Sequence, residues 1–254
     1  MILLKSPTDL AVMRRAGEIA ARALQAVVRA VRPGITTREL DRIAEDRIRR
    51  LGAEPAFLGY RGFPASLCTS VNDEVVHGIP GPRRLHEGEI ISLDLGAVLE
   101  GFHGDLAVTV PVGKVSPAVA RLLRVTAEAL EVGIRAVRPE GHLGDVSAAI
   151  QRYVETHGFS VVREFAGHGI GRHLHEEPQI PNFGRPGNGV ALRPGMTLAI
   201  EPMVNMGTSE VVMDADGWTV RTRDGKPSAH FEHTVAVGDD GPIVLTGLPP
   251  DGSV

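Results

Sequence analysis

Three histidines lie within eight positions of the segment GHGIGRHLHEEP, which spans residues 167–178. They are His168, His173 and His175. A neutral imidazole binds transition metals, and its ordinary pKa of about 6.5 lets it exchange protons around neutral pH. The segment therefore offers candidates for a metal ligand and a proton carrier, and its chemistry depends on which acids lie beside it.

Two pairs of similar segments each carry an acid. The pairs are LHEGEIISLD (85–94) with LRPGMTLAIE (192–201), and HGDLAVTV (103–110) with HFEHTVAV (230–237). The first pair aligns Asp94 with Glu201, and the second aligns Asp105 with Glu232. Each pattern is expected to end an apolar strand in an acid, where an unpaired charge is costly. Four carboxylates brought together would repel one another, whereas two divalent cations would neutralise them, so the pattern predicts a two-metal site.

The elements that must position these acids are repeated as well. Residues 31–52 and 137–158 share a Val-Arg-Pro start and a closing glycine. Capping boxes at Ser6 and Thr36 predict that two helices begin there, and a further helix is predicted near Ser116. The chain is therefore predicted to consist of two pseudosymmetric halves, each with helices followed by strands.

The second half is predicted to be the longer one. The first strand pair is offset by 107 residues and the second by 127, so the difference of 20 residues indicates an insertion, which we place around Trp218. The halves would span about residues 1–115 and 116–254.

Composition limits the classes of function. The chain has 254 residues, 43% of them apolar, and a net charge of -4, so it can bury a sizeable core but lacks the basic field of a nucleic-acid binder. Its one cysteine, Cys68, excludes an intrachain disulfide. The start MILLK is too short an apolar run for a signal peptide, and no later run approaches the roughly 18 residues of a membrane span. We therefore expect a soluble cytoplasmic protein with no specific nucleic-acid site and no membrane contact.

Five motifs in order along the chain resemble those of the short, type I methionine aminopeptidases of metallopeptidase family M24. They are GYRGFPASLCTSVNDEVVHGIP (59–80), SLDLGAVLEGFHGDLAVTV (92–110), GHGIGRHLHEEP (167–178), AIEPMV (199–204) and HFEHTVAV (230–237). The resemblance covers nearly the full chain. It implies an α/β (α+β) pita-bread fold, in which helices cover a central curved antiparallel sheet, and a single catalytic domain over residues 1–254.

The same resemblance implies the metal ligands. Five residues would bind two divalent ions, namely Asp94, Asp105, His168, Glu201 and Glu232. Asp105 and Glu232 would bridge the ions, Asp94 would bind one of them, and His168 with Glu201 would bind the other. Such ligands suit Co, Mn, Fe or Zn. The physiological metal stays open, because it is decided by the order of metal affinities together with the supply of each metal in the cell.

The resemblance also implies catalytic and substrate-binding residues. Glu201 would accept a proton from the attacking water, while His175 and His77 would stabilise the tetrahedral intermediate and assist the leaving nitrogen. A slot for a thioether is implied for Phe57, Tyr60, Phe63, Cys68, His77, Leu174, His175 and Trp218. Phe57 and Leu174 stand where many relatives carry cysteine and phenylalanine, so the shape of the slot is less defined than the metal site.

These residues imply a metal-dependent aminopeptidase that removes the initiator methionine from nascent polypeptides with a small second residue. It would act as a monomer, and any transient ribosome contact would use the catalytic domain itself. An alternative of the same fold is a proline-specific aminopeptidase or dipeptidase, and a more distant one is a non-catalytic binding module. The sequence contains no G-x-S-x-G, H-E-x-x-H or C-x-x-C motif, which argues against a serine hydrolase or a mononuclear zinc enzyme. His173 has no role in the family and is expected to be a solvated or packing histidine.

Overall fold

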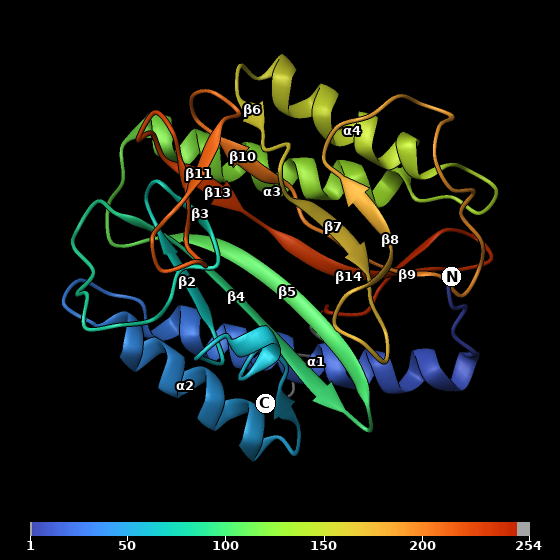
Figure 1. Ribbon diagram of the computed structural model, residues 1–254, viewed down its shortest axis with the longest axis horizontal. Coiled ribbons are helices and arrows are strands. Elements are labelled where there is room, and N and C mark those ends of the chain that lie inside the picture. The colour runs from blue at the N-terminus through green and yellow to red at the C-terminus, as the bar shows by residue number, and fades with distance from the viewer. Residues whose placement is uncertain (1, 248–254) are drawn as a thin grey trace.

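The computed structural model describes residues 2–247. In this part of the chain a curved antiparallel sheet is covered by helices (Figure 1). The helices are α1 (Pro7–Ala30), α2 (Thr37–Arg50), α3 (Pro117–Ala136) and α4 (Leu143–Thr156), with a short 3-10 turn, η1 (Tyr60–Gly62). The strands are β1 (Glu54–Pro55), β2 (Cys68–Val71), β3 (Glu74–Val76), β4 (Ile90–Leu99), β5 (Phe102–Pro111), β6 (Ser160–Val161), β7 (Ala166–Gly169), β8 (Glu176–Pro181), β9 (Thr197–Ile200), β10 (Met203–Asn205), β11 (Val211–Met213), β12 (Val220–Thr222), β13 (Ser228–His230), β14 (Glu232–Val237) and β15 (Pro242–Val244).

The central sheet joins strands from both halves of the chain. Its order is β1-β4-β5-β14-β9-β7-β8, with β2 beside β4 and β15 beside β14. Two smaller sheets, β13-β10-β6 and β11-β12-β3, lie outside this path. The helix pair α1 and α2 precedes β4 and β5, and the pair α3 and α4 precedes β9 and β14. This repeated order confirms the predicted mixed fold with a central antiparallel sheet.

The helices begin where the sequence predicts. Ser6 caps α1, because its hydroxyl accepts a hydrogen bond from the Asp9 N–H while the Asp9 carboxylate accepts one from the Ser6 N–H. Thr36 and Glu39 form the same capping box at the start of α2. Ser116 caps α3, and α4 lies inside the second copy of the repeat. None of the helices in the described part of the chain is long and apolar enough to cross a bilayer.

Each helix pair buries its apolar face against its own half of the sheet. Leu24 of α1 and Leu40 of α2 belong to one buried cluster with Leu93 of β4. Ile150 of α4 belongs to a second cluster with Leu198 of β9. Figure 1 shows the blue pair α1 and α2 on one side of the molecule and the green and yellow pair α3 and α4 on the other. Burial of each such side chain stabilises the fold by about 1.5–3 kcal/mol.

The insertion predicted around Trp218 forms two additional strands. β11 and β12 pair with each other, and β12 also pairs with β3 from the first half. Trp218 lies in the turn between β11 and β12. The insertion therefore carries this side chain back to the first half of the chain.

The acids do not all end their strands, contrary to the expectation from the repeats. Asp94 lies in the middle of β4, Asp105 lies within β5, and Glu232 begins β14. Glu201 directly follows the last residue of β9. The backbone of Asp94 and Asp105 continues the β4–β5 ladder, so a strand extends past an acid whose side chain leaves the plane of the sheet.

The two halves of the sheet meet between β5 and β14, where the backbone ladder is short. Two residue pairs are in register at this seam, Glu232 with Ala107 and His233 with Leu106. The neighbouring contacts across the seam come from side chains instead.

Threonine hydroxyls extend the seam on both sides of this short ladder. Thr234 Oγ1 accepts a hydrogen bond from the Asp105 N–H at 3.0 Å and donates one to the Asp105 carbonyl at 2.8 Å. Thr109 Oγ1 binds the N–H and carbonyl of His230 in the same way, at 2.8 Å each. Ser92 lies 2.8 Å from the Thr109 hydroxyl, whose remaining lone pair accepts its proton. Both threonines are buried, so these bonds satisfy backbone groups that water cannot reach.

Replacing Thr109 by valine should destabilise the seam. The change keeps the side-chain shape but leaves the buried N–H and carbonyl of His230 unpaired, so the free energy of unfolding should fall by about 2–4 kcal/mol. Urea denaturation in the presence of a chelator would measure the loss without a contribution from metals. Thr8 is exposed on α1, and Thr8→Val should change the same quantity by less than about 0.5 kcal/mol. Equal stability of Thr109→Val and the parent protein would contradict this role for the hydroxyl.

Candidate metal centre and adjoining pocket

The five predicted ligands come together because four of them lie on neighbouring strands of the central sheet and the fifth, Glu201, directly follows a strand of the same sheet. In the strand order β4, β5, β14, β9 and β7 they are Asp94, Asp105, Glu232, Glu201 and His168. The first two come from the first half of the chain and the others from the second half. The sheet therefore brings together residues that are far apart in the sequence.

The strand register places three of the acids on one face of the sheet. Asp94 pairs with Ala107, and Ala107 pairs in turn with Glu232 across the seam. Asp105 lies two residues from Ala107 on the same strand, so its side chain leaves the same face. The small side chain of Ala107 therefore has a carboxylate on either side of it and a third along its own strand.

The buried oxygens of this cluster fit a divalent cation. One ligand atom from each of Asp105, His168 and Glu232 lies within 4.8 Å of the others. Glu201 Oε1 lies 3.6 Å from His168 Nε2. Asp94 Oδ1, Asp105 Oδ1 and Glu232 Oε1 are buried and have no hydrogen-bond partner within residues 2–247. Buried carboxylate oxygens without a donor are costly, and carboxylates with an imidazole are ligands for divalent transition metals.

Burial, together with mutual repulsion for three of the four acids, raises the pKa values of this cluster when no cation is bound. Burial raises the pKa of Asp94 from 3.8 to about 7. Burial, followed by repulsion from Asp94 and Glu201, raises the pKa of Asp105 well above its ordinary range. The pKa of Glu201 is raised by burial and then by Asp94, and that of Glu232 by burial and then by Asp105. A divalent cation favours the ionised forms, so its binding should release protons.

His168 presents a free ring nitrogen to the acids. Its Nδ1 lies 2.9 Å from the carbonyl oxygen of Gly169, which can only accept, so Nδ1 carries the hydrogen and Nε2 keeps a lone pair. Burial lowers the pKa of His168 to about 4, so the ring is neutral at pH 7. A Cβ atom on Gly167 would lie 2.3 Å from the Ala199 carbonyl oxygen, so a glycine is required where β7 packs against β9.

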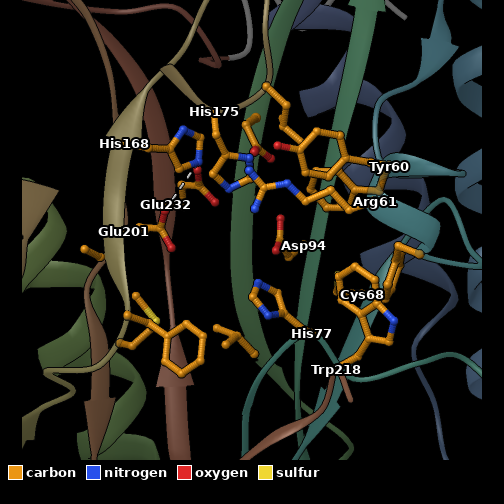
Figure 2. A pocket seen from close by; sticks show the side chains of 18 residues that line it. Tyr60, Arg61, Cys68, His77, Asp94, His168, His175, Glu201, Trp218 and Glu232 are labelled. Carbon is orange, nitrogen blue, oxygen red and sulfur yellow. Dashed lines mark ion pairs between the residues drawn. The ribbon is translucent and has the colours of Figure 1, made fainter. Parts of the chain in front are cut away.

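Every residue predicted to bind metal, bind substrate or act in catalysis lines one cavity of about 180 Å³ (Figure 2). Figure 2 shows Glu201, Glu232 and His168 on one side of this cavity and Tyr60, Cys68 and Trp218 on the other. The predicted slot residues in its wall are Phe57, Tyr60, Phe63, Cys68, Leu174 and Trp218, with His77 and His175. The cavity therefore joins a largely apolar wall to an acidic one.

His175 belongs to a stack of rings in this cavity. Its ring centroid lies 4.0 Å from that of His168 and 5.3 Å from that of Tyr60, whose plane is inclined by only 14°. Desolvation, followed by repulsion from His168, lowers the pKa of His175 to about 3. The ring is therefore neutral at pH 7 and can donate an N–H to a bound molecule.

His77 enters the cavity from a strained backbone. Its φ of 61° lies in the left-handed region, which is uncommon for a residue with a side chain. Gly78 fixes this turn, because its N–H donates to Ser70 Oγ and a Cβ atom there would lie 2.2 Å from the Thr69 carbonyl oxygen. Burial lowers the pKa of His77 to about 4, and its ring centroid lies 6.4 Å from that of Trp218.

Residues at the start of the chain anchor the segment that carries His175. Lys5 forms an ion pair with Glu176, and the two side chains are only 6% and 7% exposed. Glu176 also accepts a hydrogen bond from the His173 N–H. The N–H of Lys5 donates to the Gly195 carbonyl at 2.7 Å. The side chain of His173 is exposed and does not line the cavity.

Cys68 is a wall residue with little nucleophilic character. It is buried, and burial followed by repulsion from Asp94 raises the pKa of its thiol well above the ordinary range. A thiol that stays protonated is a poor nucleophile but a soft, polarisable contact for an apolar ligand.

The structure adds residues that the sequence motifs do not single out. The further lining residues are Arg61, Val76, Phe165, Ala166 and Met203. His230 is also close, since its buried Nε2 lies 3.7 Å from Glu201 Oε2. His230 ends β13 and Glu232 begins β14, so the usable signal was only that His230 lies two positions before an acid in the motif HFEH. Met203 likewise lies two positions from an acid, Glu201, in the motif AIEPMV, whereas Phe165 lies outside the five motifs.

Comparison with known proteins places these features in a family. The model of metallopeptidase family M24 matches residues 11–239. A methionine aminopeptidase of Clostridium perfringens is 54% identical over 246 residues, which cover 97% of this chain and 99% of that protein. The crystal structure of the methionine aminopeptidase of Thermotoga maritima superimposes with a TM-score of 0.96 at 48% identity and covers 97% of this chain and 99% of that one.

A more distant similarity concerns the fold alone. The prolidase of Pyrococcus horikoshii has a TM-score of 0.79 at 21% identity, and the match covers 98% of this chain but 65% of that one. The pita-bread fold expected from the sequence is confirmed by these structural similarities. The chain is far more similar in sequence to the methionine aminopeptidases than to the prolidase, and this similarity extends over nearly its whole length. The chain belongs to metallopeptidase family M24, among its methionine aminopeptidases.

Proposed function

We propose that this chain is a metal-dependent aminopeptidase that removes the initiator methionine from nascent proteins and peptides with a small second residue. One arrangement carries the proposal: neighbouring strands, and the residue that directly follows one of them, supply five ligand-type side chains beside a cavity with an apolar wall. The apolar wall suits a thioether, and the acidic wall suits cations and the free amino group of a peptide. The names of the relatives with high identity support the choice of methionine.

Two divalent ions form part of this proposal. Asp94, Asp105, Glu201 and Glu232 together carry four negative charges when ionised, and two divalent cations balance them. The resemblance to the family implies that Asp105 and Glu232 would contribute to the binding of both ions. Asp94 would bind one ion, and His168 with Glu201 would bind the other. Co, Mn, Fe or Zn suit this ligand set, and when bound they supply the Lewis acidity that activates water and polarises a carbonyl.

The side chains around the ions have separate tasks in the proposed reaction. Glu201 accepts the proton that the attacking water loses. His175, neutral at pH 7, donates an N–H to the scissile carbonyl oxygen as negative charge develops on it. His77, which is also neutral, hydrogen-bonds to the leaving amide nitrogen.

The apolar wall would hold the methionine side chain of the substrate. Phe63 and Trp218 meet edge to face with ring centroids 5.1 Å apart, and Tyr60 lies on the same side of the cavity as Trp218. The remaining wall residues of this kind are Phe57, Cys68 and Leu174. With the free amino group facing the acids, only the first residue of a peptide fits, which makes the activity that of an exopeptidase.

The cellular setting follows from this substrate. We propose that the chain acts as one catalytic domain in the cytoplasm, as a monomer, and that any ribosome contact uses the surface of this domain. The two halves, about residues 1–115 and 116–254, would act together because both supply ligands. A proline-specific activity is not favoured, since the relatives of high identity are methionine aminopeptidases.

A panel of peptides should separate the proposed activity from the prolyl alternative. The purified protein with Mn²⁺ or Co²⁺ should release methionine from Met-Ala-Ser, and it should act far more slowly on Met-Leu-Ser and Ala-Pro-Ser. Release of free amino acids, followed by chromatography, gives the result. Cleavage of Ala-Pro-Ser alone would refute the methionine specificity.

Removal of the His175 imidazole should slow the chemical step. His175→Ala should lower kcat by about 10²–10³-fold with a much smaller change in KM, because the lost N–H acts on charge that develops in the transition state. His173→Ala is the matched control on the same segment, since the His173 side chain is exposed and lies outside the cavity lining. Equal kcat values for the two variants would contradict the assigned role.

The metal-free protein should lose stability as the pH rises above 6.5. The pKa values of Asp105, Glu201 and Glu232 are raised in the folded state, so protonation of these groups stabilises the fold at low pH. This stability is lost progressively as the pH rises through the folded-state pKa of each carboxyl. The stabilisation that Asp94 contributes is lost as the pH rises through its pKa of about 7. The buried histidines oppose this trend only below their unfolded pKa of 6.5. Thermal midpoints in a chelator should therefore fall as the pH rises above 6.5, and Mn²⁺ should abolish the fall. A flat profile in the chelator would be the contrary result.

A further inference from the structure

His230 is a buried imidazole that the roles assigned above do not use. Its side chain is 2% exposed, and its Nε2 has no hydrogen-bond partner among the described residues, 2–247. This atom lies 3.7 Å from Glu201 Oε2 and 3.9 Å from Glu232 Oε2. A buried polar atom that stays unpaired costs about 1–3 kcal/mol, so its position beside two acids indicates a role.

The backbone of His230 is fixed, so the ring stays beside the acids. Its N–H and carbonyl are both bound by the Thr109 hydroxyl across the seam. It also ends β13, where it pairs with Met203 of β10. Met203 lines the same cavity as Glu201, so these contacts hold His230 next to the acids of the cavity.

Glu201 lies between two imidazoles that face its two oxygens. His168 Nε2 is 3.6 Å from Oε1, and His230 Nε2 is 3.7 Å from Oε2. The bond from His168 Nδ1 to the Gly169 carbonyl leaves a lone pair on His168 Nε2, as a metal ligand needs. The group of converging ligand atoms contains Asp105, His168 and Glu232 and leaves out His230. The two rings are therefore placed for different tasks.

The ionisation of the acids decides which hydrogen His230 carries. Carboxylates that are ionised around a cation only accept hydrogen bonds. A ring nitrogen that faces them is satisfied only if it carries a hydrogen, so Nε2–H is the favourable tautomer. This is the opposite of the tautomer at His168.

We propose that His230 is a positioning residue of the metal centre, whose neutral Nε2–H donates a hydrogen bond to the Glu201 carboxylate. This bond holds Glu201 in the orientation in which it binds a cation and accepts a proton. The inference rests on the proposed function only in requiring that the acids bind metal. Its tests therefore use metal binding and ring protonation as readouts, and cleavage of peptides is measured separately.

The tautomer can be observed in the unmodified protein. In protein labelled with ¹⁵N-histidine and loaded with Zn²⁺, long-range ¹H–¹⁵N correlation spectra should show His230 as the Nε2–H tautomer and His168 as the Nδ1–H tautomer. A His230 ring without a hydrogen on Nε2 would overturn the proposal. This measurement needs no substitution, so it decides the question even where a variant fails to fold.

Two substitutions separate the donor from the shape of the side chain. Glutamine and methionine have similar length, but only His230→Gln retains an N–H. After removal of metal, calorimetric titration with Mn²⁺ should show a Kd about 10–100-fold weaker for His230→Met and within about threefold of the parent for His230→Gln. Unchanged affinity in His230→Met would overturn the proposal. Equal losses in both variants would also overturn it, because they would make Nε2 a direct metal ligand.

A neighbouring histidine supplies the matched control. The ring of His233 bonds to the Thr246 hydroxyl at 2.8 Å and does not line the cavity. His233→Met should therefore leave the Kd for Mn²⁺ within about threefold of the parent value. A loss as large as that of His230→Met would attribute the effect to the fold and refute the specific role. Failure of all proteins to cleave Met-Ala-Ser, with these affinities as expected, would refute the proposed function and leave this inference intact.

Discussion

Four carboxyl groups are held together inside this protein, where each loses water and repels the others. The cost is visible in their raised pKa values and in buried oxygens that have no donor within residues 2–247. Only protons or cations relieve such a cluster, so the fold is coupled to whatever occupies it. The rest of the architecture serves to bring these groups to one place. Two helix pairs support two half-sheets, and the acids gather where the half-sheets meet.

The acids gather beside the seam between the half-sheets, where the backbone ladder is short. A continuous ladder between β5 and β14 would bring the strands into regular contact along their length, but two pairs in register join them here. The hydroxyls of Thr109 and Thr234 bind the backbone groups beyond that short ladder. Side-chain bonds thus replace backbone bonds at the point where Asp105 and His230 must be positioned. The seam therefore satisfies its buried backbone groups beside the cavity that the acids line.

Local signals in the sequence predict the helices and much of the site. The capping boxes at Ser6 and Thr36 give the helix starts, and the motifs give the residues that line the cavity. The strand ends were predicted less well, because Asp94 and Asp105 lie inside strands whose extent depends on pairing with distant residues. His230 was missed although its spacing from Glu232 was informative. Phe165 lies outside the motifs and reaches the cavity through long-range packing, which no local pattern encodes.

The ion pair between Lys5 and Glu176 connects the beginning of the chain to the segment that bears His175. Both side chains are almost fully buried, so removal of either one would leave the other as an unpaired buried charge. The residues that position 5 can tolerate are therefore limited by a residue more than half the chain length away. Positions 5 and 176 should therefore covary among related sequences, so that a substitution at one is accompanied by a substitution at the other.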